Sequence, residues 1–514
     1  MSRAFDVRRL DFLKGKHMKN IYRAIALLLV ILTLLGALVS CKKDEETSDD
    51  SETTVSTEEE SKKSALEQSG LEIRDMGGAP MNIWYSTKSV WSPYPMDVTA
   101  EESVGDVINE AGYQRNEKLV KDLNIELKYT QSSTDPNGSG DLNDGTVLRN
   151  LWMSGDTNAY DMIFTGAYVC STLAIEGFFF DLAESEYIHP DADYYESQVN
   201  EQARFMGHQF FAMGYYSVMN TAALEVTFVN ATIVEDITNG EVTMDALYDK
   251  ALKNEWTMSE MLAIGDLYAT GDTNTGDYNF DQYSAIVSNN GAHSIYHWLG
   301  GTTVEWNDAS ERYNCTLSSK KNVDLLTWIQ DNITDNPNFG LVKNDNHDEA
   351  FLGKASPFLV TPMDVVWDIM DSGINWGLLP PPCYNVGDEY RSFSTGWNVN
   401  FAGIVSSCTD IDKATYLYEM YMCYSYDYIY PAYYEKCFKL QYQPSVKSAQ
   451  VFDVIAHSRF VDLSNLYSLN KSISIKSIVQ DSSKEVGSSV KSASDSITTN
   501  LKGLIDNFNN RSAQ

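Results

Sequence analysis

Hydrophobic positions follow two alternating periods in the part of the chain that begins near residue 81. Three segments have the apolar runs or the period-two alternation of strands: 81–85, 124–131 and 161–165. Two segments between them have the apolar spacing of helices: 104–123 and 146–154. This order predicts βαβ units and a parallel sheet. Because ligands bind beyond the carboxyl ends of the strands in open parallel sheets, we expect a site near the loops after Tyr85 and Thr165.

The same alternation continues toward the C-terminus. Residues 222–230 (AALEVTFVN) predict another strand, and helical patterns occupy 243–253, 257–270, 320–331 and 411–424. Near the end of the chain, apolar residues recur at spacings of three and four: Val486, Val490, Ala493, Ile497, Leu501, Leu504 and Phe508. Such a stripe predicts a final helix docked on the folded body.

The N-terminal region has the pattern of an export signal. Residues 24–39 (AIALLLVILTLLGALV) carry no charge and follow Lys19 and Arg23. As a helix, this run would span roughly 24 Å, less than the roughly 30 Å of a hydrocarbon core. A basic region before a short apolar run is typical of a signal peptide, which we place at residues 1–40. Met18 is a credible true start, because the residues before it add nothing to the pattern.

An acidic segment follows the predicted signal. Residues 44–60 contain nine Asp or Glu, seven Ser or Thr and one Val, which is too little apolar surface to fold. We expect residues 41–80 to form a disordered, self-repelling tether. A body of about 430 residues comes after it.

Composition and charge narrow the class of protein. The 514 residues are 43% hydrophobic and 21% charged, which excludes a wholly disordered chain. With 38 basic and 72 acidic residues, the net charge is −34, and such a surface repels nucleic acid and anionic lipid. The six cysteines after Cys41 are scattered and form no zinc pattern. We interpret them as isolated thiols, with one or two disulfides as the alternative.

The apolar run ends in Leu38-Val39-Ser40-Cys41. This tetrapeptide resembles the bacterial lipobox, in which an apolar residue and two smaller ones precede a cysteine. The resemblance implies a diacylglyceryl thioether on Cys41 and cleavage before it. Several acyl chains, such as palmitate, on one residue anchor a protein more durably than one chain does. The alternative is a signal peptide or a short anchor that merely ends near a cysteine.

Several segments of the body occur in the order of one family's motifs. They are SGD at 154–156, YDMIF at 160–164, GFFFDL at 177–182, LEVTFVN at 224–230, WTMSE at 256–260, FLGK at 351–354 and GLLPPP at 377–382. Together they resemble the extracellular solute-binding proteins of ABC importers, of the large sugar-binding type (family 1). The family's strand usually ends in Tyr-Asn, whereas this chain has Val229-Asn230.

The resemblance implies a fold and a function. The fold would be α/β and two-lobed, of the periplasmic-binding-protein-like kind (type II), with the ligand in the cleft between the lobes. Lobe 1 would contain 81–190 and 350–402, and lobe 2 would contain 191–349 and 403–514. A ligand that contacts both lobes stabilises the closed form. The implied protein is a monomer without catalysis or cofactor. Anchored outside the cytoplasm at the cell membrane, it would capture a carbohydrate, expected to be an oligosaccharide, for an ABC permease's transmembrane subunits.

A sugar site needs flat aromatic rings for C–H faces and short polar groups for hydroxyls. The resemblance and the sheet rule together place ten candidates at the cleft: Trp84, Tyr85, Trp91, Tyr168, Tyr215, Tyr216, Trp298, Asp364, Trp367 and Trp397. For any single aromatic among them, the alternative is packing in the core. For Asp364, the alternative is a solvated loop carboxylate.

One loop has the composition of a cation site. Five oxygen-bearing side chains fall within ten residues: Asp272, Asn274, Asp277, Asn279 and Asp281. Calcium prefers six to eight such oxygens, but the spacing is not that of an EF-hand, so an ordinary Asp/Asn turn is the alternative. His293 and His297 are four residues apart without the glutamate of a zincin between them, and we interpret them as core or cleft histidines.

Two other functions remain open at this point. An anchored extracellular glycoside hydrolase would need two carboxylates at a fixed separation, and the many acidic residues neither identify nor exclude such a pair. The same two-lobed fold could instead bind a peptide or another solute. The sequence contains no GxSxG, HExxH or Walker motif.

Overall fold

The computed structural model describes most of the predicted body. The described residues are 63–86, 99–100, 103, 107–132, 140–155, 159–270, 282–288, 291–342, 346–393, 399–439, 445–469 and 475–511. The chain divides into two units, Met1–Lys62 and Lys63–Gln514, and both of the main sheets belong to the second. The predicted signal peptide, Cys41 and the acidic segment 44–60 lie outside the described residues.

The first sheet has four strands in the order β12-β3-β1-β2. Their bounds are Ala79–Tyr85 (β1), Ile125–Gln131 (β2), Met162–Gly166 (β3) and Asn400–Ile404 (β12). β1 pairs in parallel with β2 and β3, and Tyr85 lies opposite Gln131 and Phe164. β12 pairs antiparallel with β3. The associated helices are α3 (Val107–Leu123), α4 (Gly140–Met153) and α5 (Ala167–Glu176). The predicted βαβ order is therefore confirmed.

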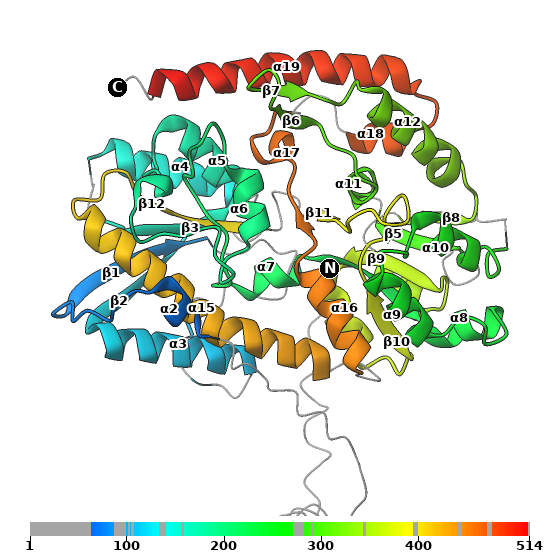
Figure 1. Ribbon diagram of the computed structural model, residues 1–514, viewed down its shortest axis with the longest axis horizontal. Helices are drawn as coiled ribbons and strands as arrows, with labels where there is room; N and C mark the ends of the chain where they lie inside the picture. The colour runs from blue at the N-terminus through cyan, green and yellow to red at the C-terminus, as the bar shows by residue number, and fades with distance from the viewer. Residues whose placement is uncertain are drawn as a thin grey trace, which may run out of the picture. The chain divides into compact units, whose positions relative to one another are not determined.

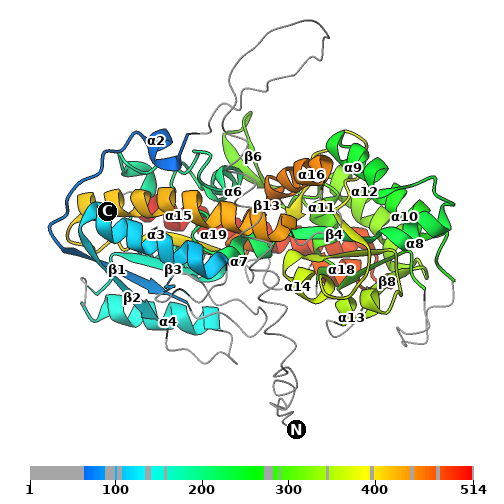
Figure 2. The ribbon, with the colours of Figure 1, turned by 90° about the horizontal axis from the view of Figure 1, so that it is seen from below.

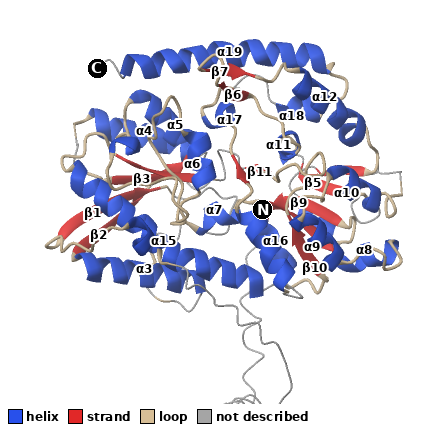
Figure 3. Ribbon diagram, in the orientation of Figure 1, coloured by secondary structure: helices blue, strands red, loops and turns tan. Residues whose placement is uncertain are grey.

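The second sheet has five strands in the order β10-β4-β9-β5-β8. Their bounds are Glu225–Asn230 (β4), Ala285–Ser288 (β5), Phe339–Val342 (β8), Phe358–Pro362 (β9) and Trp376–Leu379 (β10). β5 pairs in parallel with β8 and β9, and β4 runs antiparallel to β9 and β10. The helices α8 (Ala231–Ile237), α9 (Met244–Leu252), α10 (Met258–Gly265) and α13 (His347–Leu352) connect these strands. Figure 3 shows the two main sheets as separate groups of strands with helices beside each. The mixed α/β fold is as predicted.

Gly265, at the end of α10, is required by a close approach of two backbones. A Cβ atom at this position would lie 2.1 Å from the backbone oxygen of Ser284. Only glycine therefore lets α10 approach the chain that enters β5.

The chain passes between the two sheets at positions other than those expected. It runs from α7 (Val218–Ala222) into β4 and from β11 (Ser392–Phe393) into β12. After α15 (Ile411–Lys439) it continues to α16 (Val446–Ala456), a helix that packs on α9 and β10. The expectation that 350–402 belongs to lobe 1 does not hold for β9 and β10, because both pair with β4 in the second sheet. β12, which begins at the end of that range, pairs with β3 in the first sheet.

α15 also departs from the expected division, since residues after 403 were assigned to lobe 2. This helix packs lengthwise on α3, beside the first sheet, as Figures 1 and 2 both show. Its buried tyrosine-rich face provides the apolar area that holds it there.

The segment expected to complete the tether is instead part of the folded body from residue 63 onward. α2 (Ala65–Ser69) packs on α15, and the Ala65 amide donates to Asp427 Oδ1 at 2.8 Å. The Arg74 guanidinium lies 4.5 Å from the ring centroid of Tyr416 and 5.1 Å from that of Tyr187. These cation–π and hydrogen-bonding contacts offset the cost of ordering a polar segment.

The remaining elements lie around and between the two sheets. Their bounds are Ser197–Ala203 (α6), Ser294–Trp298 (α11), Val304–Asn307 (β6), Arg312–Cys315 (β7), Lys320–Ile329 (α12), Val366–Ile369 (α14), Val446–Ala456 (α16), Arg459–Phe460 (β13), Leu463–Leu466 (α17), Ile475–Val479 (α18) and Val486–Arg511 (α19). α19 is the predicted final helix, and all seven residues of its apolar stripe are buried. It packs on α5 as well as on α12 and β7, so it contacts elements associated with both sheets (Figure 1).

Two properties bear on the expectations from the sequence. Cys170, Cys315, Cys383, Cys408 and Cys423 are thiols, in agreement with the first interpretation, and the side chain of Cys437 is outside the description. Among the described helices, none has both the length and the apolar character needed to cross a bilayer.

Candidate functional site

The carboxyl ends of the parallel strands define one edge of each sheet. In the first sheet this edge runs through Tyr85, Gln131 and Gly166, and the antiparallel β12 begins there at Asn400. In the second sheet it runs through Ser288, Val342 and Pro362, and the antiparallel β4 begins there at Glu225. By the general rule for open α/β sheets, these are the edges at which ligands bind.

Hydrogen bonds connect the two edges through three short elements, α7, β11 and β13, which we call the junction. The Glu225 amide donates to Ser392 Oγ of β11 at 2.6 Å. β11 pairs in parallel with β13, and Arg459 of β13 donates through Nη2 to the carbonyl of Asn220 in α7. Asn220 and Asn400 exchange two hydrogen bonds of 3.0 and 3.1 Å. Figure 1 shows α7 and β11 between the two groups of strands. Both carboxyl edges therefore converge on the junction.

Glu225 is a buried acid at the second sheet's edge. Its Oε1 accepts from Ser294 Oγ at 2.7 Å, and its Oε2 accepts from Trp298 Nε1 at 2.6 Å. Burial raises the pKa of Glu225 to about 8, although the hydrogen bonds from Ser294, Trp298 and the Phe393 amide oppose the shift. At neutral pH the acid is therefore mainly protonated, and it orients the indole ring of Trp298.

Aromatic rings from three elements surround the same region. His297 of α11 stacks on Phe393 of β11, with ring centroids 4.0 Å apart and an interplanar angle of 18°. Phe460 of β13 lies 5.8 Å from His297, and the Arg391 guanidinium carbon lies 4.5 Å from the Phe460 ring centroid. Burial lowers the pKa of His297, so its ring is neutral and acts as an aromatic surface at neutral pH.

A buried ion pair ties the junction to the first sheet's side. Arg459 Nε lies 3.7 Å from Glu196 Oε1, and their side chains are 1% and 7% exposed. Burial raises the pKa of the Glu196 carboxyl, and the guanidinium opposes that shift. The pair fixes β13 against the chain that leads into α6.

The structure places four of the ten predicted cleft residues at or beside the junction. Trp298 contacts Glu225 through its indole N–H. Tyr168, half-buried at the start of α5, donates to Asn465 Oδ1 of α17 at 3.3 Å. Tyr215 is buried against Tyr430, with ring centroids 4.8 Å apart. Asp364, half-buried, follows β9 in a short 3-10 turn that packs on α7.

Of the other six, three pack within the first sheet, and the side chains of three are not described. Trp84, Tyr85 and Tyr216 are buried in the packing of the first sheet, and Tyr216 stacks on Phe164 with centroids 4.5 Å apart. In this conformation these three rings present no open face, so ligand contact by them stays a prediction. Trp91 and Trp397 lie outside the described residues, and the side chain of Trp367 does as well.

The predicted calcium loop is outside the described residues with all five of its members: Asp272, Asn274, Asp277, Asn279 and Asp281. Within the part of the chain that the structure describes, no group of three or more His, Cys, Asp or Glu side chains is arranged to hold a metal ion. His293 and His297 contact Phe393 instead, in keeping with their interpretation as core or cleft histidines.

Sequence reasoning missed Glu225, Arg391 and Arg459. Glu225 and Arg459 each had a detectable signal, since each is a charged residue within an otherwise apolar strand segment: Glu225 in LEVTFV and Arg459 in RFV. Charged residues are rarely buried without a partner, so such positions indicate either a specific polar contact or a site. For Arg391, no pattern in the neighbouring residues singles it out.

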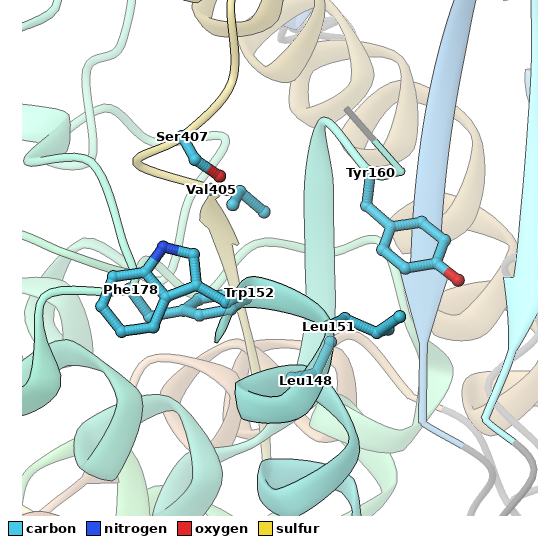
Figure 4. A pocket seen from close by; sticks show the side chains of 7 residues that line it. All are labelled: Leu148, Leu151, Trp152, Tyr160, Phe178, Val405 and Ser407. Carbon is cyan, nitrogen blue, oxygen red and sulfur yellow. The ribbon is translucent and has the colours of Figure 1, made fainter. Parts of the chain in front are cut away.

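A small hollow opens elsewhere, at the opposite edge of the first sheet. Figure 4 shows Trp152 and Phe178 on one side of it and Tyr160 on the other. Tyr160 precedes β3, and Val405, which also lines the hollow, follows the antiparallel β12. Because this is the amino edge of the sheet, the hollow is separate from the junction.

Comparison with known proteins adds little to this geometry. No family model matches the chain, and no curated protein matches it. Among solved structures, the chain is similar to the ABC substrate-binding protein Lmo0181 from Listeria monocytogenes in complex with cycloalternan. That likeness has a TM-score of 0.48 and 15% sequence identity, and covers 83% of this chain and 99% of that chain. At this level of similarity the match carries no argument. The description of the fold therefore rests on the strand pairing given above.

Proposed function

We propose that this chain is the substrate-binding protein of an ABC importer and that its ligand is a carbohydrate, expected to be an oligosaccharide. The observation that carries the proposal is the convergence of the carboxyl edges of two sheets on one junction. In this proposal each sheet with its helices forms one lobe, of the periplasmic-binding-protein-like kind. The ligand binds between the lobes and favours their closure. The closed, loaded form then delivers the ligand to the permease without altering it.

The chemistry around the junction suits a sugar. The half-buried ring of Tyr168 can cover a C–H face of a sugar. A half-buried polar side chain such as Asp364 can exchange hydrogen bonds with hydroxyls, each worth about 1 kcal/mol net. The sequence motifs that resemble solute-binding proteins lead to the same function by a separate route.

Titration calorimetry of the purified body (residues 63–514) against a panel of oligosaccharides tests the proposal. We expect at least one glycan to bind with one-to-one stoichiometry. Tyr168→Ala should weaken that binding about tenfold or more, because it removes a half-exposed ring at the carboxyl edge. Tyr268→Ala is the matched control. Tyr268 is also half-buried, but it donates to the carbonyl of Lys354 at the amino edge of the second sheet.

Two results would contradict the function. A folded protein that binds no glycan across a broad panel would argue for a different solute. Steady hydrolysis of a bound glycan would favour the anchored glycoside hydrolase, especially if a single Asp or Glu substitution abolished it.

We infer from the lipobox-like tetrapeptide that Cys41 carries the lipid anchor. Cys41→Ser should abolish labelling by a palmitate analogue in a bacterial host and move the protein from the membrane pellet to the soluble fraction. Cys315→Ser, which changes a half-exposed cysteine of β7, should leave both properties unchanged. Labelling that survives Cys41→Ser would show that the anchor is elsewhere, or that the signal is of another kind.

A further inference from the structure

Arg391 holds a charged donor that the fold leaves unused. It directly precedes β11 at the junction, and its guanidinium lies over the Phe460 ring at 4.5 Å. Its Nη1 atom is buried and has no hydrogen-bond partner among the described residues. Buried N–H groups are almost always paired in folded proteins, and an unpaired charged donor is costly. The stacking contact nevertheless keeps this guanidinium in one place.

Nearby carboxylates offset only part of the cost of burying the Arg391 charge. Burial lowers the pKa of Arg391, and four nearby carboxylates oppose that shift: Glu389, Glu305, Asp462 and Asp388. The oxygens of Asp462 accept hydrogen bonds from Thr303, Ser464 and Asn465 rather than from Arg391 Nη1. The guanidinium therefore lacks an oxygen acceptor for Nη1, although four carboxylates already lie in its neighbourhood.

The chemistry of the acceptor follows from this balance. An anionic group brought to Nη1 would gain from the guanidinium but would be repelled by four surrounding carboxylates. A neutral pair of hydroxyl oxygens would gain the hydrogen bonds without the repulsion. The planar fork of arginine suits two adjacent oxygens better than one.

We propose that Arg391 is a specificity-determining residue that donates hydrogen bonds to adjacent hydroxyls of a neutral sugar, so that the protein selects neutral glycans over sugar acids. The inference rests on the proposed carbohydrate-binding function and names its substrate class.

The experiment compares two glycans of equal length, one neutral and one built from uronic acid, by titration calorimetry against the body (residues 63–514). The wild type should bind the neutral glycan at least tenfold more tightly. Arg391→Met keeps a side chain over Phe460 but removes the donors, and should weaken binding of the neutral glycan by about tenfold to a hundredfold. Arg391→Lys keeps the charge without the planar fork. Its affinity for the neutral glycan should lie between those of the wild type and Arg391→Met.

Arg149→Met is the control variant, because the Arg149 guanidinium is paired with Glu176 between α4 and α5, away from the junction. It should leave the affinity unchanged. Thermal unfolding of each variant separates loss of folding from loss of binding, and Arg391→Lys serves if Arg391→Met does not fold. If the wild type binds a glycan equally well with and without Arg391, or prefers the uronic acid glycan, the inference fails while the proposed function stands. If no glycan binds the wild type, the proposed function fails and the inference with it.

Discussion

Replacing Arg459 with methionine is expected to lower the free energy of unfolding by about 3–5 kcal/mol at neutral pH. The substitution leaves the Glu196 carboxylate buried without its counter-charge and removes the donor to the Asn220 carbonyl. An uncompensated buried charge is the costly species, since neither water nor a partner solvates it. Because Glu196 can escape this cost by taking up a proton, the loss should be smaller at pH 5 than at pH 7. Urea unfolding followed by tryptophan fluorescence measures the effect.

The double variant Arg459→Met/Glu196→Leu shows whether the unpaired charge causes the loss. It removes both ions and replaces them with apolar side chains, so most of the lost stability should return. Arg149→Met breaks an ion pair whose side chains are about one-third exposed, and should cost about 1 kcal/mol or less. A double variant no more stable than Arg459→Met would show that the Glu196 charge is not the cause.

Glu225→Gln is expected to flatten the dependence of stability on pH. The pKa of Glu225 is raised to about 8 in the folded protein by burial, against about 4.3 for an exposed glutamate. The stabilisation associated with the protonated side chain is fully present below the unfolded pKa. It is lost as the pH rises from the unfolded pKa through the folded one. Between pH 5 and pH 8, the wild type should therefore lose a few kcal/mol that the variant does not.

Glutamine suits this test because it resembles the protonated acid. Its carbonyl can accept from Trp298 Nε1, and its amide can donate to Ser294 Oγ. Glu419, whose pKa burial raises to about 7, contributes a trend of the same sign in both proteins, so the measured quantity is the difference between them. Glu117→Gln, an exposed change on α3, is the control and should follow the wild type. Parallel curves for Glu225→Gln and the wild type from pH 5 to pH 8.5 would mean that Glu225 is ionised throughout.

Local patterns predicted the strands and helices well because each is decided by neighbouring residues. The period-two run at 124–131 and the stripe that ends at Phe508 correspond to β2 and α19 almost residue for residue. The parallel order of β1, β2 and β3 also followed, because a strand, a helix and a strand in succession have one favoured arrangement.

Local sequence patterns could not predict which strands pair when they are far apart in the chain. The apolar strands β9 and β10 could complete either sheet as far as their own residues show, and their pairing with β4 depends on packing far along the chain. The junction was hidden for a related reason. Asn220 and Ser392 are unremarkable within their own segments, and their roles arise only when distant pieces of chain meet. Aromatic residues after strands were good candidates for a site, but Trp84 and Tyr216 pack in the sheet's own core.

The position of β12 also has a consequence for biosynthesis. The first three strands of the first sheet are complete by residue 166, but the partner of β3 on its open edge is made only at residues 400–404, after every strand of the second sheet. A nascent chain therefore carries an unpaired strand edge throughout the translation of the intervening region. Such an edge favours chain-to-chain association, so fragments that end before residue 400 should aggregate, and folding of the whole chain should be slow and late.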